Sequence, residues 1–509
     1  MRGLLVDHLY TSDDDIIEFD APDEAGEFQI EFDAPDEAGE FQCVEADDDE
    51  EDPDELADPL EAYMTPQPGA DGVSPRWPAK LRLLLLGSLD GGDPASQTGL
   101  LAGVAPMLKH RSQSFHVERP ARVVAIYHEL FEQQLVSRAR LVPARLASDE
   151  DLCLVHERRL VRRATGSYSA DEDAVAALGL DGDTYFSAAS SGYAARLSAG
   201  SVVELATRIA QGELRNALAV TRPPGHHCEQ NQAMGFCLLN NVPVAVAAVR
   251  QRLGVRRALV VDWDVHHGNG VQHMFEDDAT VLYISLHRYG FGFYPGTGAP
   301  DEVGGSYGGA SAARGKTVNV GFRLPGMGDA EYRHAFERVV MPIAREFDPD
   351  FVFVSAGFDA ALGDPLGGMR LSPAGYAYMT AQLCTLAGGR VLVALEGGYN
   401  LRSISRSACA VMRVLLGDAP PPLAADEPHP AAKLDVDATL RAHAPWWRCA
   451  AAQVAAQTAV ARAPVDVAKP LTSHPRMTAR AHTIRRRKRG PKAWWWRRAA
   501  PWRMRQLFV

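Results

Sequence analysis

Two aspartates and a histidine in the segment DWDVH have the spacing of a metal site. Asp262, Asp264 and His266 alternate along this segment, which follows an apolar run. Alternate residues of an extended chain point to the same side, so the three groups would share one face. Ionisable groups at the end of a buried strand are costly to desolvate unless they bind a metal or pair with an opposite charge. An isolated Asp-x-His is more often structural, but here the segment HGNG follows directly, and its glycines permit a tight backbone.

A further acidic residue, Asp359, would complete the ligand set. It ends the segment SAGFD, which follows another apolar run. Together, Asp264, His266 and Asp359 would supply two carboxylate oxygens and one imidazole nitrogen, and a fourth position would stay open for substrate or water, as in catalytic zinc sites. Zinc is therefore the predicted cofactor. Because two of the three ligands are carboxylates, Fe²⁺ or Co²⁺ could take its place.

Two adjacent histidines and a tyrosine could do acid–base chemistry beside this metal. His226 and His227 end the segment RPPGHH, and Tyr399 lies in EGGYN. Imidazoles exchange protons near neutral pH, and Asp262 and Asn269 are the candidates to orient the two rings, which should then differ in basicity. The tyrosine hydroxyl could donate to an oxyanion formed when water attacks a carbonyl. Taken singly, the histidines would more often be incidental surface residues and the tyrosine a packing residue.

Three aromatic residues could line a slot beside these groups. Phe236 lies in MGFC, and Phe293 and Tyr294 lie in GFGFYPGTG. A narrow aromatic slot would accept an unbranched alkyl chain, although aromatics in such loops more often pack in the core.

The elements that must position these residues are strands that alternate with helices. Apolar runs predict strands at 81–86, 217–220, 258–261, 281–285, 351–355 and 391–395, and segments of helical period predict helices at 202–213, 242–253, 330–347, 374–387 and 403–416. This alternation predicts an α/β fold: a single large domain with a central, mostly parallel sheet flanked by helices. Polar, His-rich and Gly-rich segments follow five of the strands. Ligands bind at the carboxyl ends of such strands, so these segments should converge there.

Charge divides the 509-residue chain into a nearly neutral body and two charged ends. Residues 1–60 contain 24 acidic residues and one arginine, whereas residues 481–509 contain ten Lys and Arg and no acidic residue, within a net charge of −13. Residues 1–75, in which 17–29 recur as 30–42, are predicted to be a disordered acidic tail, with docking to basic partners as the alternative. We expect a catalytic domain at 80–418 and an Ala/Pro-rich linker with weak helix at 419–480.

The basic, Trp-rich tail at 481–509 has three interpretations. It could be a nuclear-import signal, it could contact nucleic acid through basic and stacking side chains, or it could be a disordered tail or the product of a mistaken gene model. The seven cysteines include no CxxC pair, which favours reduced thiols inside the cell. No apolar run approaches the roughly 20 residues of a membrane helix, and no targeting peptide is evident. We expect a soluble protein of the nucleus, the cytoplasm or both.

The motifs RPPGHH, MGFC, VDWDVHHGNG, SLHRYG, FYPGTGAPDEVG, VVMPIA, SAGFDA and ALEGGYN resemble those of class II zinc-dependent histone deacetylases, and they occur in the same order from about residue 98 to 416. The resemblance implies the arginase/deacetylase fold and assigns roles to matching residues. These are zinc ligands at Asp264, His266 and Asp359, catalytic histidines at His226 and His227, and a transition-state tyrosine at Tyr399.

The resemblance also implies a substrate channel and structural cations. The acetyl-lysine channel would be lined by Phe236 and Tyr294, with Gly235 at its inner end and Arg122 near an exit for acetate. One K⁺ or Na⁺ ion would be bound by Asp262, Asp264, His266, Ser285 and Leu286, and another by a group that includes Phe275, Asp278 and Val281.

Three positions bear on activity and regulation. Class IIa enzymes of vertebrates have histidine in place of the tyrosine and lose most activity on acetyl-lysine, whereas this chain keeps Tyr399. Where those enzymes have cysteines for a regulatory zinc, this chain has Ser112 and Ser114, so a second zinc is not expected.

The predicted function is therefore zinc-dependent hydrolysis of Nε-acetyl-lysine in proteins, including histone tails, with release of acetate. The resemblance implies a role in chromatin regulation and transcription repression, with corepressor proteins as partners and no membrane association. One alternative is an amidohydrolase that acts on acetylpolyamines or another small amide. Another is a low-activity scaffold that binds acetyl-lysine within a corepressor complex.

Overall fold

The computed structural model describes residues 84–85, 87, 91–112, 115–165, 180, 183–305 and 312–462, the side chains of 460–462 excepted. The expected acidic tail at 1–75 and the basic tail at 481–509 lie outside the described residues. No described helix is long and apolar enough to cross a lipid bilayer.

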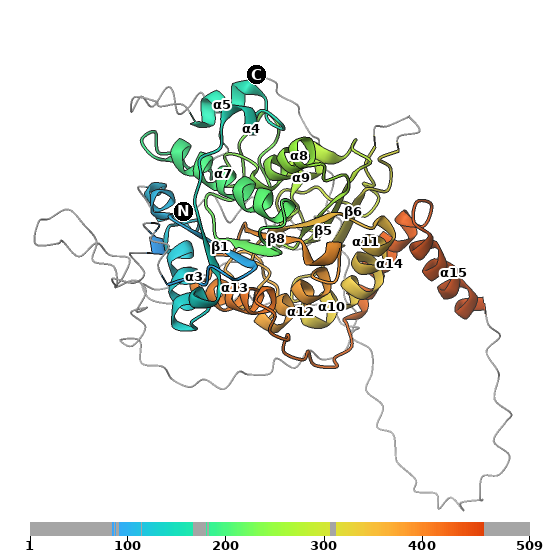
Figure 1. Cartoon of the computed structure of the whole chain (residues 1–509). Helices are drawn as coiled ribbons and strands as arrows, with labels where there is room; N and C mark the ends of the chain where they lie inside the picture. Colours follow the sequence, from blue (N-terminus) through green and yellow to red (C-terminus); the bar gives the residue numbers. More distant parts are fainter. Residues whose placement is uncertain are drawn as a thin grey trace, which may run out of the picture. The chain divides into compact units, whose positions relative to one another are not determined.

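A single sheet of eight parallel strands forms the centre of the fold, in the order β2-β1-β3-β8-β7-β4-β5-β6 (Figure 1). This architecture confirms the predicted α/β fold with a parallel sheet. The strands are β1 (Thr98–Ala102), β2 (Arg140–Pro143), β3 (Asn216–Ala219), β4 (Ala258–Asp262), β5 (Val281–Arg288), β6 (Thr317–Phe322), β7 (Phe351–Ala356) and β8 (Val391–Leu395).

Continuous apolar runs account for the strands that the sequence predicted. Every residue of β4, β7 and β8 is buried, as expected for strands covered on both faces. The strands β1, β2 and β6 were not predicted, because glycine, arginine, proline and asparagine interrupt their apolar pattern. The prediction of a strand at 81–86 is wrong over its described part, where Leu84 and Leu85 are helical. Both leucines are buried, but an apolar run indicates only burial and does not distinguish a strand from a helix.

Helices cover both faces of the sheet. On one face α7 packs against α8, and on the other α13 packs against α3 and α12 (Figure 1). The helices are α3 (Ala121–Glu132), α4 (Asp149–Leu152), α5 (Arg158–Thr165), α7 (Ser191–Ala210), α8 (Asn241–Leu253), α9 (Asn269–Phe275), α10 (Asp329–Ala335), α11 (Met341–Phe347), α12 (Pro373–Leu383), α13 (Leu401–Leu415), α14 (Pro430–His443) and α15 (Arg448–Arg462), with short helical turns at Ala105–Lys109, Val136–Arg138, Phe336–Val340 and Ala387–Gly389.

The prediction of a linker at 419–480 is corrected over the part of this segment that the structure describes. Helix α14 packs against β6 through Ala432, Val436 and Leu440, which are fully buried. The Thr439 hydroxyl donates to the carbonyl oxygen of Asn319 in β6 at 2.7 Å. These apolar residues recur every four positions, the period of one helix face, but the surrounding alanines and prolines made the segment resemble a linker. The folded unit therefore continues past residue 418.

Candidate active site

The segments that carry the predicted site residues follow four strands that are neighbours in the sheet. These strands are β3, β8, β7 and β4. RPPGHH follows β3, EGGYN follows β8, Asp359 follows β7, and Asp264 and His266 follow β4. Because the strands are parallel, their carboxyl ends lie along one edge, and the predicted convergence of these segments takes place there.

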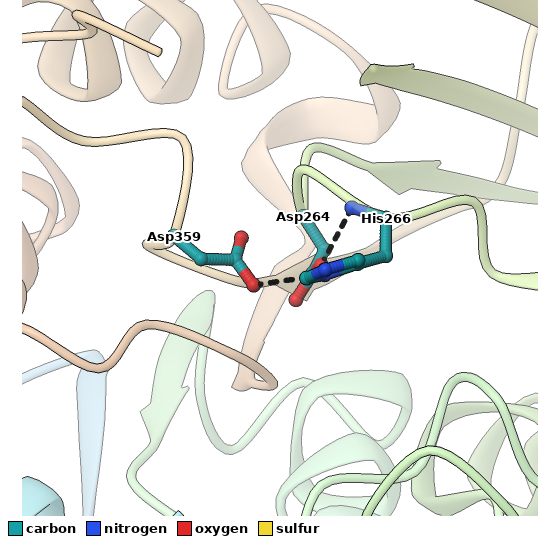
Figure 2. A group of neighbouring side chains, drawn as sticks. All are labelled: Asp264, His266 and Asp359. Atoms are coloured by element: carbon teal, nitrogen blue, oxygen red, sulfur yellow. Dashed lines mark hydrogen bonds and ion pairs between the residues drawn. The ribbon is translucent and has the colours of Figure 1, made fainter. Parts of the chain in front are cut away.

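Asp264, His266 and Asp359 form a compact buried cluster (Figure 2). One ligand atom from each lies within 4.8 Å of the other two, so the group could hold a metal ion. The His266 Nδ1 atom is 3.0 Å from Asp264 Oδ1 and 3.2 Å from Asp359 Oδ2. Both carboxylates are fully buried, whereas the imidazole is 11% exposed. Access to the cluster is therefore from the side of the histidine.

Glycines make room for the two carboxylates. The backbone N–H of Gly397 donates to Asp264 Oδ2 at 2.8 Å. A Cβ atom on Gly397 would lie 2.2 Å from Asp359 Oδ2, and one on Gly357 would lie 1.9 Å from Asp264 Oδ2. Real Cβ atoms do not approach so closely, so any other residue at either position would displace a carboxylate.

The cluster has the donor set and the electrostatics of a cation site. Burial, together with the charge of Asp264, raises the pKa of Asp359 to about 7. The Asp359 Oδ2 atom is buried and accepts no hydrogen bond, although His266 lies close to it. A buried carboxylate oxygen without a donor is costly unless a cation compensates it. The residues present therefore fit a divalent metal.

His226 is paired with a carboxylate. Its Nδ1 atom lies 3.1 Å from Asp262 Oδ2, which also accepts from the Tyr283 hydroxyl at 3.1 Å. Burial alone would lower the pKa of His226, but Asp264 and Asp262 outweigh it and raise the pKa to about 10. These two carboxylates therefore favour the protonated form of His226.

His227 is paired with an amide. Its Nδ1 atom lies 2.8 Å from Asn269 Oδ1. Burial and the neighbouring charged ring of His226 hold the pKa of His227 well below its usual range. Gly235 has φ +57 and lies against the ring, where a Cβ atom would come within 2.5 Å. The second histidine is thus neutral, with Nε2 free to accept a proton.

Tyr399 is buried near both the metal cluster and Arg122. Its backbone N–H donates to Asp364 Oδ2 at 2.7 Å, and burial raises the pKa of its hydroxyl well above the usual range. The Arg122 guanidinium lies 5.0 Å from the tyrosine ring, and its Nε donates to the carbonyl oxygen of Gly398 at 2.6 Å. Tyr399 therefore stays protonated and can donate a hydrogen bond from its hydroxyl. Arg122 contacts the backbone next to Tyr399 at Gly398.

Two of the three predicted channel aromatics contact the imidazoles of the site, and the third lies near Tyr399. Phe293 stacks on His266 with ring centroids 5.1 Å apart, and Tyr294 meets His227 edge-on at 5.0 Å. The ring of Phe236 lies 5.9 Å from that of Tyr399. These rings could flank a narrow apolar chain that leads to the cluster.

The residues of the two predicted structural cations lie together as well. Asp262 of β4 is aligned with Ser285 of β5, and Leu286 is the next residue of that strand. Near the start of β5, the backbone N–H of Asp278 donates to Phe275 and that of Val281 donates to Asp278. Occupation of these places by K⁺ or Na⁺ stays a prediction.

Four residues that support the site were missed by the sequence analysis. The Glu396 carboxylate accepts from the backbone N–H groups of Gly225 and His226, at 2.5 and 3.1 Å. The other three are Asp364, Tyr283 and Glu229, which contact Tyr399, Asp262 and Asn269. Glu396 directly follows β8 and could have been suspected. Asp364 lies in a turn well past the end of β7, and Tyr283 is one residue of an apolar strand, so neither stands out in the sequence.

Comparison with known proteins identifies the family. The family model of the histone deacetylase domain matches residues 116–415. The chain belongs to the histone deacetylase family. This confirms the resemblance to class II histone deacetylases that the motifs indicated, and with it the arginase/deacetylase fold.

Relatives and a solved structure agree with this assignment. Over 346 residues the chain is 44% identical to histone deacetylase clr3 of Schizosaccharomyces pombe, covering 66% of this chain and 50% of that protein. Over 336 residues it is 42% identical to the human polyamine deacetylase HDAC10, covering 65% and 50%. The chain thus spans about half the length of both relatives. The crystal structure of the HDA15 HD domain superposes with a TM-score of 0.64 and 43% identity, over 72% of this chain and 99% of that one.

Proposed function

We propose that this histone deacetylase family member hydrolyses Nε-acetyl-lysine in proteins and releases acetate. One observation carries the proposal: Asp264, His266 and Asp359 form a buried ligand cluster at the sheet edge where the paired histidines and Tyr399 also lie. Family membership supports the same reaction.

Asp264, His266 and Asp359 would hold a zinc ion. When bound, zinc polarises the amide carbonyl and makes water a better nucleophile at neutral pH. The Asp359 Oδ2 atom, which is buried without a donor, supports a cation here. Because carboxylates dominate the ligand set, Fe²⁺ or Co²⁺ would also fit.

The side chains around the cluster would move the protons. His227 accepts a proton from the attacking water at Nε2 and later gives one to the leaving amine, because Nδ1 is held by Asn269. His226, which lies beside the carboxylates of Asp262 and Asp264, supports it electrostatically. Tyr399 donates a hydrogen bond to the oxyanion of the tetrahedral intermediate. The rings of Phe236, Phe293 and Tyr294 hold the lysine side chain.

Acetate release from an acetyl-lysine peptide tests this proposal. We expect hydrolysis by the purified, zinc-loaded chain, loss of activity after chelation, and recovery when zinc is restored. Asp264→Asn should lower zinc content measured by elemental analysis. A zinc-replete protein that binds the peptide and releases no acetate would contradict the proposal and favour the corepressor scaffold.

An acetylpolyamine substrate is a second candidate. The observation that favours it is the 42% identity to a human protein named polyamine deacetylase HDAC10. Competition between acetylspermidine and an acetyl-lysine peptide separates the two. We expect the peptide to be hydrolysed with the higher kcat/KM, and a preference for acetylspermidine would assign the small amide instead.

We further propose action on chromatin, with corepressor proteins as partners, in the nucleus and in the cytoplasm. The basic segment 481–509 supports import. A fluorescent reporter that carries these residues should accumulate in the nucleus, and one with the five basic residues of 485–489 changed to alanine should not. A cytoplasmic reporter would refute the signal.

A further inference from the structure

The amide of Asn269, the partner of His227, is itself held by a carboxylate. Its Nδ2 atom donates to Glu229 Oε1 at 2.5 Å. The other acceptors within reach of Nδ2 are poorer: the carbonyl oxygen of His227 at 3.3 Å and the Met234 sulfur at 3.6 Å. Charge-assisted hydrogen bonds are roughly twice as strong as neutral ones. Glu229 therefore makes the principal contact of this amide group.

The direction of this amide decides the protonation of His227. An asparagine side chain has a donor end and an acceptor end, whereas a carboxylate only accepts. With Nδ2 on Glu229, Oδ1 faces His227 Nδ1 at 2.8 Å and accepts a hydrogen bond from its N–H. In the reversed orientation two oxygens would meet at Glu229, and Nδ2 would donate to Nδ1 of the histidine, so that the imidazole proton would lie on Nε2. Glu229 thus keeps the proton of His227 on Nδ1 and leaves Nε2 unprotonated.

Glu229 is in turn held from the outer side. The Nδ1 atom of His273, on α9, lies 2.9 and 3.1 Å from its two carboxylate oxygens. The hydrogen bond to Glu229 raises the pKa of His273. The Glu229 carboxylate is 19% exposed and the His273 imidazole is 43% exposed. A chain of hydrogen bonds therefore leads from the surface at His273, through Glu229 and Asn269, to the buried imidazole of His227.

We propose that Glu229 is a positioning residue for the deacetylation reaction: it fixes the Asn269 amide so that His227 is held as the tautomer that can act as base. The inference rests on the proposed function. Neither Glu229 nor His273 touches the metal cluster or the substrate in this assignment, so both act only through Asn269.

Exchange of charge between the two residues tests the proposal. Asn269→Asp alone would set two carboxylates against each other, and we expect kcat/KM to fall about 100-fold. Adding Glu229→Gln restores a donor to the new carboxylate, so the double variant should recover to within about tenfold of wild type. Glu229→Ala should lose about tenfold. Glu204→Gln is the matched control: this carboxylate is 21% exposed, pairs with Arg208 on α7, and should leave activity unchanged.

Histidine tautomers give a readout that is independent of turnover. In the ¹⁵N spectrum of histidine-labelled protein, the His227 signals, assigned from their loss in His227→Gln, should show the Nδ1–H tautomer in wild type and a mixture in Glu229→Ala. Losses that multiply in the double variant, or an unchanged tautomer in Glu229→Ala, would overturn the positioning role. If wild type releases no acetate, the proposed function fails, and the spectrum alone then decides the role of Glu229.

Discussion

The side chains that orient the two adjacent histidines differ by one atom. Where Asp262 has its second carboxylate oxygen, Asn269 has an amide nitrogen. A carboxylate stabilises a positive imidazole and an amide does not. Together with Asp264, this difference favours the protonated form of His226, whereas burial and the neighbouring His226 keep His227 neutral, so two residues of one type can take different parts in one reaction.

Tyr399 should matter for turnover and not for metal binding. Its hydroxyl stays protonated, and its ring is held by Arg122. Tyr399→Phe removes only the hydroxyl, so we expect kcat on an acetyl-lysine peptide to fall roughly 10²-fold with the zinc content unchanged. Tyr193→Phe, at a half-exposed position on α7, serves as the control. Equal turnover in Tyr399→Phe and wild type would remove Tyr399 from the mechanism.

At the residue level, the sequence predicted the site residues that belong to recognisable motifs. Asp264 and His266 lie just after the end of β4, where the chain bends and Asp264 Oδ1 accepts from the backbone N–H of His266 at 2.9 Å, and Asp359 follows the neighbouring strand. Glu229 and Tyr283 could not be found this way. Their hydrogen bonds join segments far apart in sequence, and side-chain packing decides which of the available polar groups meet.

At the scale of elements, the order of the strands in the sheet brings the site residues close together. The strands β3, β8, β7 and β4 are adjacent in the sheet although β8 comes last in sequence. Alternating apolar and helical patterns predicted the parallel sheet, because burial on both faces shows in the composition. They did not predict its order or the edge strands β2 and β6, whose shorter or interrupted runs resemble loops.

Helix α14 should contribute to the stability of the fold. Leu440 is fully buried against the core, whereas Leu434, on the same helix, is 56% exposed. Leu440→Ala should therefore lower the free energy of unfolding by about 2–5 kcal/mol, and Leu434→Ala by less than about 0.5 kcal/mol. Urea denaturation of the two variants measures the difference. Similar values for both would show that α14 is dispensable to the folded unit.

On the scale of the whole molecule, the chain combines a deacetylase unit with two segments of opposite charge. The 24 acidic residues of 1–60 and the ten basic residues of 481–509 lie outside the described residues. Composition predicted this division because charge density is visible in the sequence itself.

The helix that lies on β6 has a practical meaning for fragments of this protein. The family match ends at residue 415, before α14 begins at Pro430. A fragment that ends at that boundary would lack α14, the helix that covers the edge strand β6. The exposed backbone of an edge strand is a template for pairing with other chains. Preparations that end there would tend to self-associate, so inhibitor affinities and oligomeric states measured on them would describe the assembly instead of the enzyme.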